Sequence, residues 1–340
     1  MALRFGVIGI DHRHIYELMQ YLMDAGMECA GYCAETTNPR VLEGVRKRFP
    51  HLPAIAEKAR LLEDRSVQVI ATAGIPSERA GIAIEAMRHG KDVLSDKPGV
   101  ATRAQLAEVE RMVKETGRIF AIAFGERFMS RAGSVARELL CEGAIGRLVQ
   151  TVSLSPHRLN RALRPDWFWR PETNGSILVD IASHHIEKFL TITERLEAEV
   201  VHATIRSVAP ERTPVAKFQD FGELVLRNDV ATAYVRVDWF TPDGLADWGD
   251  GRAFILGTEG SIEVRHNLDL AGRPGSQHLF LVTREKTTYI SCEDRPLTAF
   301  RAFANDVRDR TETAMPQAHC FAVCRIALEA EEKAGTTWMQ

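Results

Sequence analysis

The chain has 340 residues, of which 45% are hydrophobic and 26% charged, and its formal net charge is −3. This length predicts two domains, each able to bury a core, and the near-neutral charge gives no support for binding to nucleic acid or an anionic membrane. No run approaches the roughly 18 apolar residues of a membrane span. The N-terminus enters a strand pattern at once, with no room for a signal peptide, so we expect a cytoplasmic protein.

Residues 3–124 alternate between strand-like and helix-like segments. The expected strands are 3–9, 27–34, 67–73, 92–95 and 119–124, and the expected helices are 15–25, 39–49, 78–89 and 103–116. Such alternation predicts parallel strands joined by right-handed helical crossovers, a Rossmann-type doubly wound sheet. Ligands on such sheets bind at the carboxyl ends of the strands.

Beyond residue 124 the pattern changes to short strands with tight turns. The segments after it are a helix (131–143), a strand (148–155), a proline-bounded loop (157–172) and a helix after Gly175. Residues 199–291 then alternate over short distances, which predicts a large, mostly antiparallel sheet, and two helices close the chain. We therefore expect an α/β fold with an N-terminal domain of residues 1–124 and a C-terminal α+β domain of residues 125–340. The last helix is a candidate to pack back on the first domain.

The six cysteines are expected to be free thiols. Cys29 and Cys33 are four positions apart, as are Cys320 and Cys324, and neither pair has Cys-x-x-Cys spacing. The pairs therefore give little support for a zinc site. Without a secretory segment, disulfides are also disfavoured.

The first strand ends in a turn that begins at Gly9. A dinucleotide-binding loop would read Gly-x-Gly-x-x-Gly, and here Asp11 and His14 replace the second and third glycines. Gly9 keeps the tight turn, and the following helix offers its dipole to a pyrophosphate, whereas an Asp11 carboxylate would repel it. Glu35, at the end of the second strand, stands where a carboxylate would bind the adenosine ribose, which favours NAD over NADP. The alternative for Glu35 is an ordinary surface charge.

The histidines of this turn, His12 and His14, also permit a metal hypothesis. Imidazoles two residues apart in a loop can both bind a metal, and Asp180, His184 and His185 would be further ligands. A histidine in a loop more often caps a helix or binds an anion, so we expect no metal.

A second motif, residues 90–98, ends a strand at the functional edge of the predicted sheet. It closes with Asp96, Lys97 and Pro98, and the proline holds Lys97 toward an extended conformation. A lysine so placed can polarise a substrate oxygen. The alternative is a surface lysine beside an aspartate.

A third motif lies in the helix after Gly175. Apolar residues at helical spacing give this helix one apolar face, and Asp180 and His184, four positions apart, share the opposite face. A carboxylate one turn from an imidazole can orient the ring for general-base catalysis near neutral pH. The alternative is a solvated stripe that continues through Glu187 and Lys188.

In combination these motifs resemble the glucose–fructose oxidoreductase / inositol dehydrogenase / rhizopine catabolism (Gfo/Idh/MocA) family. Residues 90–98 are similar to its Gly-Lys-x-Val-x-x-Glu-Lys-Pro signature, with Asp96 for Glu. Residues 175–184 are similar to its Gly-Gly-x-Leu-x-Asp-x-x-x-His signature, with Ser176 for Gly. Residues 257–260 match a frequent hairpin of its second domain, and Arg79 stands where many members have His. The resemblance covers nearly the whole chain.

The resemblance implies a first domain that binds a nicotinamide cofactor and a second that binds substrate and oligomerises. The usual reaction is reversible oxidation of a secondary alcohol to a ketone on a sugar, cyclitol or related polyol. By resemblance, His184 removes the hydroxyl proton, Lys97 stabilises the alkoxide, and Asp180 binds the substrate and orients His184. The residues expected to bind NAD are Gly9, Asp11, His12, His14, Glu35, Ala73, Gly74, Pro76, Asp96 and Lys97. Those expected to bind substrate are Arg127, Trp167, Trp169, Arg170 and His185, with core packing as the alternative for both tryptophans.

Two other functions stay open at this point. One is an enzyme that retains NAD and uses transient oxidation for elimination, epimerisation or glycoside cleavage; the other is a non-catalytic ligand-binding member. We also expect a homodimer or homotetramer, because family members usually pair through the antiparallel sheet. The apolar surface expected on one face of that sheet is formed by Val225, Ala233, Val235, Val237 and Trp239.

Overall fold

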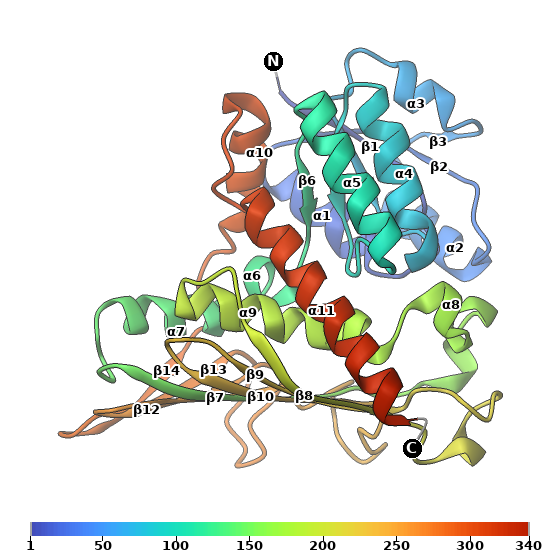
Figure 1. Cartoon of the computed structure of the whole chain (residues 1–340). Coiled ribbons are helices and arrows are strands. Elements are labelled where there is room, and N and C mark those ends of the chain that lie inside the picture. The colour runs from blue at the N-terminus through green and yellow to red at the C-terminus, as the bar shows by residue number, and fades with distance from the viewer. Residues whose placement is uncertain (1, 339–340) are drawn as a thin grey trace. The chain divides into compact units, whose positions relative to one another are not determined.

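Six parallel strands form the first sheet, in the order β3-β2-β1-β4-β5-β6, in a computed structural model that describes residues 2–338 (Figure 1). This is the strand order of a Rossmann fold and confirms the predicted doubly wound sheet. The strands are β1 (Arg4–Val7), β2 (Glu28–Cys33), β3 (Ala54–Ile55), β4 (Val69–Thr72), β5 (Asp92–Ser95) and β6 (Phe120–Ile122). The sequence pattern missed β3 and the helix α3 (Ala59–Glu63), which are too short to show a period.

The helices of this half begin and end where their capping residues require. Thr102 accepts a hydrogen bond from the backbone of Gln105 at the start of α5, and Gly117, with a left-handed backbone, ends it. A proline occupies the first turn of both α2 and α4. The four main helices are α1 (Ile15–Asp24), α2 (Pro39–Arg48), α4 (Pro76–Arg88) and α5 (Arg103–Thr116).

The second sheet has eight strands in the order β14-β13-β12-β11-β7-β10-β9-β8. Neighbouring strands are antiparallel except β10 and β7, which pair in parallel. The mostly antiparallel sheet is therefore confirmed, and all eight strands fall within or beside segments expected to be strands. They are β7 (Leu148–Pro156), β8 (Glu199–Arg206), β9 (Phe221–Arg227), β10 (Thr232–Asp238), β11 (Arg252–Gly257), β12 (Ser261–Arg265), β13 (His278–Val282) and β14 (Thr287–Ser291).

One face of this sheet, the inner face, is covered by helices (Figure 1). The expected helix after Gly175 is present, but it opens with a π-helical turn, η3 (Leu178–Ala182), and continues as α9 (Ser183–Thr193). Gly222 on β9 permits the close approach of η3, because a Cβ there would lie 2.8 Å from Ile177 and 3.0 Å from Leu178. The remaining helical segments are α6 (Gly125–Phe128), α7 (Arg131–Cys141), η1 (Arg161–Leu163), η2 (Asp166–Trp169), α8 (Pro171–Asn174), η4 (Pro210–Arg212), α10 (Ala299–Asp309) and α11 (Gln317–Trp338).

The expected apolar surface of the antiparallel sheet was assigned to the wrong residues. Ala233, Val235, Val237 and Trp239 are buried and face the core, because residues two apart on a strand share one face; only Val225 lies on the outer face, half-buried. The outer face carries instead a cross-strand row that is mostly apolar or aromatic. In register across the sheet, this row is Tyr289, Phe280, Glu263, Phe254, Val152, Tyr234 and Val225.

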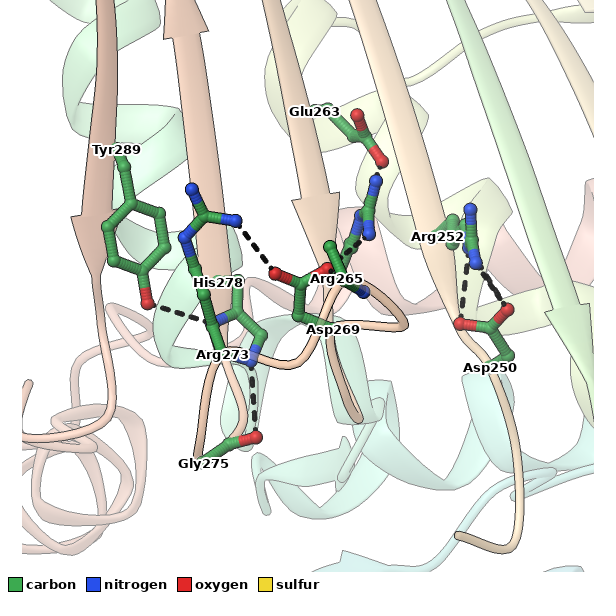
Figure 2. Close-up of polar contacts among 10 residues, drawn as sticks. Asp250, Arg252, Glu263, Arg265, Asp269, Arg273, Gly275, His278 and Tyr289 are labelled. Atoms are coloured by element: carbon green, nitrogen blue, oxygen red, sulfur yellow. Dashed lines mark hydrogen bonds and ion pairs between the residues drawn. The ribbon is translucent and has the colours of Figure 1, made fainter. Parts of the chain in front are cut away.

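Ion pairs hold the connection between β12 and β13 (Figure 2). Asp269, whose side chain is fully buried, accepts hydrogen bonds from Arg265 at 2.6 Å and Arg273 at 2.9 Å. The pKa of Asp269 is lowered to about 2. The hydrogen bond from the backbone N–H of Ala271 is the largest cause, and the hydrogen bond from Arg273 is the next. On the neighbouring strands, Nδ1 of the buried His278 forms a hydrogen bond with the Tyr289 hydroxyl at 2.9 Å. Polar contacts therefore fix this edge of the sheet.

Contacts group the described residues into two units. The first contains the chain up to Ala123, together with 165–175 and 298–324, and the second contains the other described residues. The loop that carries the tryptophans thus groups with the Rossmann sheet, which the sequence pattern did not predict. None of the described helices combines the length and apolar character needed to cross a membrane.

Candidate active-site residues

The turn after β1 and the turn after β4 lie against each other in the first unit. The backbone N–H of His12 donates to the carbonyl of Ala73 at 2.8 Å, and that of Ala73 donates to Gly9 at 3.0 Å. Gly9 has a φ of +79°, and a Cβ there would lie 2.9 Å from Gly74. Glycine is therefore required at position 9, and four of the predicted cofactor residues, Gly9, His12, Ala73 and Gly74, are brought together here.

Asp11 has a different task from the one expected. Its buried carboxylate accepts hydrogen bonds from the hydroxyls of Thr36 and Thr37, both at 2.8 Å, and from the Thr37 backbone at 2.7 Å. The carboxylate therefore holds the loop that follows β2. The sequence pattern could not show these threonine partners, because it does not show where a side chain points.

Glu35, at the start of the same loop, is exposed. A second carboxylate, that of Glu78 in the first turn of α4, belongs to the same neighbourhood. The pKa of Glu78 is raised, mainly by burial and to a smaller extent by the charges of Asp11 and Glu35. The carboxylates of Glu35 and Glu78 therefore place negative potential at this corner of the unit.

Asp96, at the end of β5, is the centre of a buried polar cluster. Its carboxylate lies 3.0 Å from His14 Nδ1, 3.5 Å from His12 Nδ1 and 3.0 Å from Arg79 Nη2. Burial favours protonation, yet His14 and Arg79 hold the pKa of Asp96 well below its usual value. Burial lowers the pKa of His12, so this ring is neutral at pH 7.

Three of these side chains have the spacing of metal ligands. The ligand atoms of His12, His14 and Asp96 lie within 4.8 Å of one another. Asp180, His184 and His185, which the metal hypothesis added, are not in this group. Arg79 already pairs with Asp96 and would repel a cation. The negative charge of Asp96 is therefore balanced by the Arg79 guanidinium.

Arg79, which was not among the predicted site residues, is central to this cluster. Its side chain is 1% exposed, and its guanidinium donates to the carbonyls of Gly74 at 2.8 Å, of Pro98 at 3.2 Å and of Lys97. It thus ties the end of β4 to the cis Lys97–Pro98 peptide. The sequence indicates this burial only by placing a charged residue on the face of α4 that also carries Ala80 and Ala83.

The predicted substrate residues of the aromatic loop separate into two groups. Trp167 is buried, with its ring centroid 6.2 Å from that of His12, and its indole N–H has no hydrogen-bond partner among the described residues. Trp169 packs edge-on against Phe168, and Arg170 is exposed. Trp167 is thus in ring contact with His12, another predicted site residue of this unit.

In the second unit, His184 is bound to the start of α6. The backbone N–H of Gly125 donates to His184 Nδ1 at 2.8 Å, and the ring lies edge-on to Phe124. Because a backbone N–H can only donate, Nδ1 carries no proton, and the neutral ring carries its proton on Nε2. The ring therefore presents a donor at Nε2.

The face of α9 that carries His184 is not a solvated stripe. Asp180, Glu187 and Lys188 are all buried, so that alternative was wrong. Arg127 lies in this unit, where its guanidinium bonds to Glu187 at 3.2 Å and Thr191 at 3.0 Å. Polar residues line the helix because α6 supplies charged partners, which helical spacing cannot reveal.

Known proteins match both halves of the chain. Residues 3–124 match "Oxidoreductase family, NAD-binding Rossmann fold", and residues 134–263 match "GFO/IDH/MocA C-terminal domain". A solved structure from Erwinia carotovora atroseptica SCRI1043, of a protein assigned as an oxidoreductase, is 40% identical, covers 98% of both chains and has a TM-score of 0.92. The chain therefore belongs to the GFO/IDH/MocA family of oxidoreductases.

More distant relatives include enzymes with named substrates. Levoglucosan dehydrogenase of Pseudarthrobacter phenanthrenivorans is 27% identical over 183 residues, which are 52% of this chain and 45% of that protein. A solved structure of levoglucosan dehydrogenase, in complex with NADH and levoglucosan, shares the fold at 19% identity and a TM-score of 0.78, covering 99% of this chain and 98% of that one. The matches to curated relatives span 33% to 58% of their lengths.

Proposed function

We propose that the protein is an NAD(H)-dependent oxidoreductase that interconverts a secondary alcohol and a ketone on a sugar, cyclitol or related polyol. The observation that carries the proposal is how the backbone of the buried Lys97 is held. Arg79 binds the carbonyls of Lys97 and Pro98 and, through Asp96, the histidines of the first turn. A lysine fixed at the carboxyl end of a central parallel strand stands at the ligand edge of a Rossmann sheet.

The first turn fits a dinucleotide in spite of its missing glycines. Gly9 keeps the left-handed turn, and the Asp11 carboxylate is bound to Thr36 and Thr37. His14, the N-cap of α1, lies at the positive end of the helix dipole. When bound, NAD would supply a hydride acceptor at nicotinamide C4. We propose NAD over NADP because of the Glu35 and Glu78 carboxylates.

The chain's own residues would handle the proton. With Nδ1 bound to Gly125, His184 has a donor at Nε2, so we propose that it donates a hydrogen bond to the substrate oxygen. The hydroxyl proton would be relayed through Lys97 to solvent as the C–H hydride leaves for NAD, and Lys97 would stabilise the developing alkoxide. His184 would then act as a hydrogen-bond donor.

We also propose a homodimer or homotetramer that pairs through the outer face of the antiparallel sheet. The cross-strand row on this face includes Phe254, which is 38% exposed, and its strand neighbour Leu256 is 48% exposed. Exposed aromatic and aliphatic residues in register form a patch that suits burial against its own copy by two-fold symmetry.

A substrate screen tests the proposed reaction. Purified protein with NAD is offered sugars and cyclitols, and absorbance at about 340 nm reports free NADH, a general property of reduced nicotinamide. A released NADH signal with at least one polyol is the expected result. Cofactor that stays bound through turnover without net NADH, or binding of a polyol without turnover, would each contradict the proposal.

A further inference from the structure

The second unit contains a cavity between α6, α7, α9 and the inner face of the sheet, here called the α9 cavity. One wall is apolar and is formed by Ala136, Ile192, Ala253, Ile255 and Val264. The polar part of the lining, here called the polar wall, includes Glu126, Arg127, Arg137, Glu187, Lys188 and His266. His184, Asp180 and Lys97 are not among the lining residues, whereas Arg127, expected to bind substrate, is one of them and is paired with Glu187.

The polar wall contains side chains that face one another without bonding. Glu126 lies 3.4 Å from His266 Nε2, 3.6 Å from Lys188 Nζ and 3.9 Å from His185 Nδ1. Within the described chain, these three atoms, Glu126 Oε2 and His185 Nε2 have no hydrogen-bond partner. The side chains of Lys188 and His185 are only 10% and 5% exposed.

Buried polar atoms without partners are costly, at about 1–3 kcal/mol for a neutral group and more for a charged one. In native proteins such groups are usually satisfied by a protein group or an ordered molecule. Three of these atoms, His266 Nε2, Lys188 Nζ and Glu126 Oε2, belong to lining residues, which indicates that this wall is completed by an occupant of the cavity.

Charge balance restricts what that occupant can be. Arg127 pairs with Glu187 at 3.2 Å, and Lys188 stands opposite Glu126. Burial lowers the pKa of both His185 and His266, so these rings are neutral near pH 7. Arg137 also lines the cavity, but it is exposed and its charge is solvated. The buried polar groups of the wall therefore have no net charge, and a buried cation or anion would have no countercharge.

The volume of the cavity restricts the size of the occupant. The cavity has a volume of about 60 Å³, and one water molecule occupies roughly 10–15 Å³ of such volume. The space therefore matches about four to six non-hydrogen atoms.

We propose that the α9 cavity is a second ligand site, which takes a neutral compound with several hydroxyl groups and about the size of glycerol. A hydroxyl group both donates and accepts, so one hydroxyl can donate to Glu126 Oε2 and accept from Lys188 Nζ. A further hydroxyl satisfies the ring of His266. The C–H groups of the ligand lie against Ala253 and Ile255.

The site is coupled by covalent neighbours to a residue of the proposed reaction. Glu126 follows Gly125, and His185 follows His184, while Gly125 and His184 are joined by the 2.8 Å hydrogen bond. A ligand that orders Glu126 also fixes the Gly125 end of this bond. The binding proposal itself does not depend on the proposed reaction.

The test uses the full-length protein with ¹⁵N-labelled histidines, whose ring signals are assigned with single His→Gln variants. Glycerol and 1,2-propanediol are the ligand probes, and acetate and methylammonium are the charged probes. Sucrose, which exceeds the cavity, is the co-solvent control. We expect a saturable shift of the signal of the lining His266 with the two polyols only, while the signal of the exposed His51 does not move.

Two variants locate the response. Ala136→Leu fills the cavity from the apolar wall, and Lys188→Met removes the ammonium at similar length; each should weaken the response at least tenfold. Ala107→Leu, on the exposed face of α5, is the matched control and should not alter it. Saturation that survives both cavity variants, a saturable response only to a charged probe, or no saturable response at all would overturn the proposal.

Discussion

The backbone N–H of Gly125 donates a hydrogen bond to Nδ1 of His184 at 2.8 Å, across 59 positions of sequence. This contact predicts that the neutral ring is the Nε2–H tautomer. Nitrogen chemical shifts of the labelled His184 ring would show it, with Nδ1 unprotonated and Nε2 protonated above the pKa. Gly125→Ala keeps the N–H but places a Cβ 3.3 Å from His184 Cε1, so the tautomer should persist with a shifted ring. A wild-type ring protonated at Nδ1 would contradict the contact.

Lys97 and His184 should matter far more for turnover than for cofactor binding. Lys97→Ala removes the proposed proton relay, and His184→Ala removes the proposed donor to the substrate oxygen. Each is expected to lower kcat on the order of 10²-fold or more, while the Kd for NAD stays within a few-fold. Steady-state kinetics and cofactor titration measure the two effects. The exposed Lys114 provides a control in Lys114→Ala, and a near-normal kcat in either site variant would exclude its role.

Glu35 should set the preference between the two nicotinamide cofactors. Glu35→Ser removes a carboxylate that would repel a 2′-phosphate, so affinity for NADP should rise on the order of tenfold, since about 1.4 kcal/mol corresponds to that factor. Fluorescence titration of both cofactors gives the two Kd values. Glu43→Gln, at an exposed position of α2, should change neither. Wild-type protein that binds NADP more tightly than NAD would show that Glu35 points elsewhere.

The buried His185 should destabilise the protein in acid. Burial first, then Lys188, lowers its folded-state pKa, while the unfolded chain titrates near about 6.5. The unfolded state therefore binds more protons below that pH, and the free energy of unfolding falls as the pH drops. The charged and titratable groups that face the ring are Lys188, His184, His266, His157 and Glu126.

Urea denaturation at pH 7 and pH 5 would measure this loss. Relative to wild type, His185→Gln should lose less stability between the two values, by up to about 2 kcal/mol, the most that one group titrating from about 6.5 can contribute. His51→Gln is the control, because that ring is exposed. An equal loss in wild type and His185→Gln would mean that the ring is protonated in the folded state.

The outer face of the antiparallel sheet should hold the oligomer together. Light scattering coupled to size exclusion should give a multiple of the 38.0 kDa chain mass. Phe254→Glu and Leu256→Glu place a charge on the exposed face and should shift the mass toward that of one chain. Leu163→Glu, at a leucine that is 64% exposed outside this face, should not. A single-chain mass for wild type, held across dilution, would rule out the oligomer.

The sequence by itself determined the succession of elements. Alternating apolar runs and helical periods predicted the doubly wound sheet, and period-two segments predicted the eight strands of the second sheet, because these patterns depend on neighbours a few residues apart. The motifs around Lys97 and His184 also followed from spacing and from the resemblance that it supports. Very short elements such as β3 were missed, since two residues show no period.

Only the tertiary structure decided what each polar side chain does. Asp11 binds Thr36 and Thr37, Arg79 binds Asp96 and the Lys97 carbonyl, and Lys188 is buried opposite Glu126. The partners in these contacts lie 17 to 62 positions apart in the chain. The sequence pattern of a charged residue at helical spacing does not show whether the side chain faces water or a buried partner, because distant segments supply its environment. The inward face of β10 was misassigned for the same reason, since period two identifies two faces but not which one is covered.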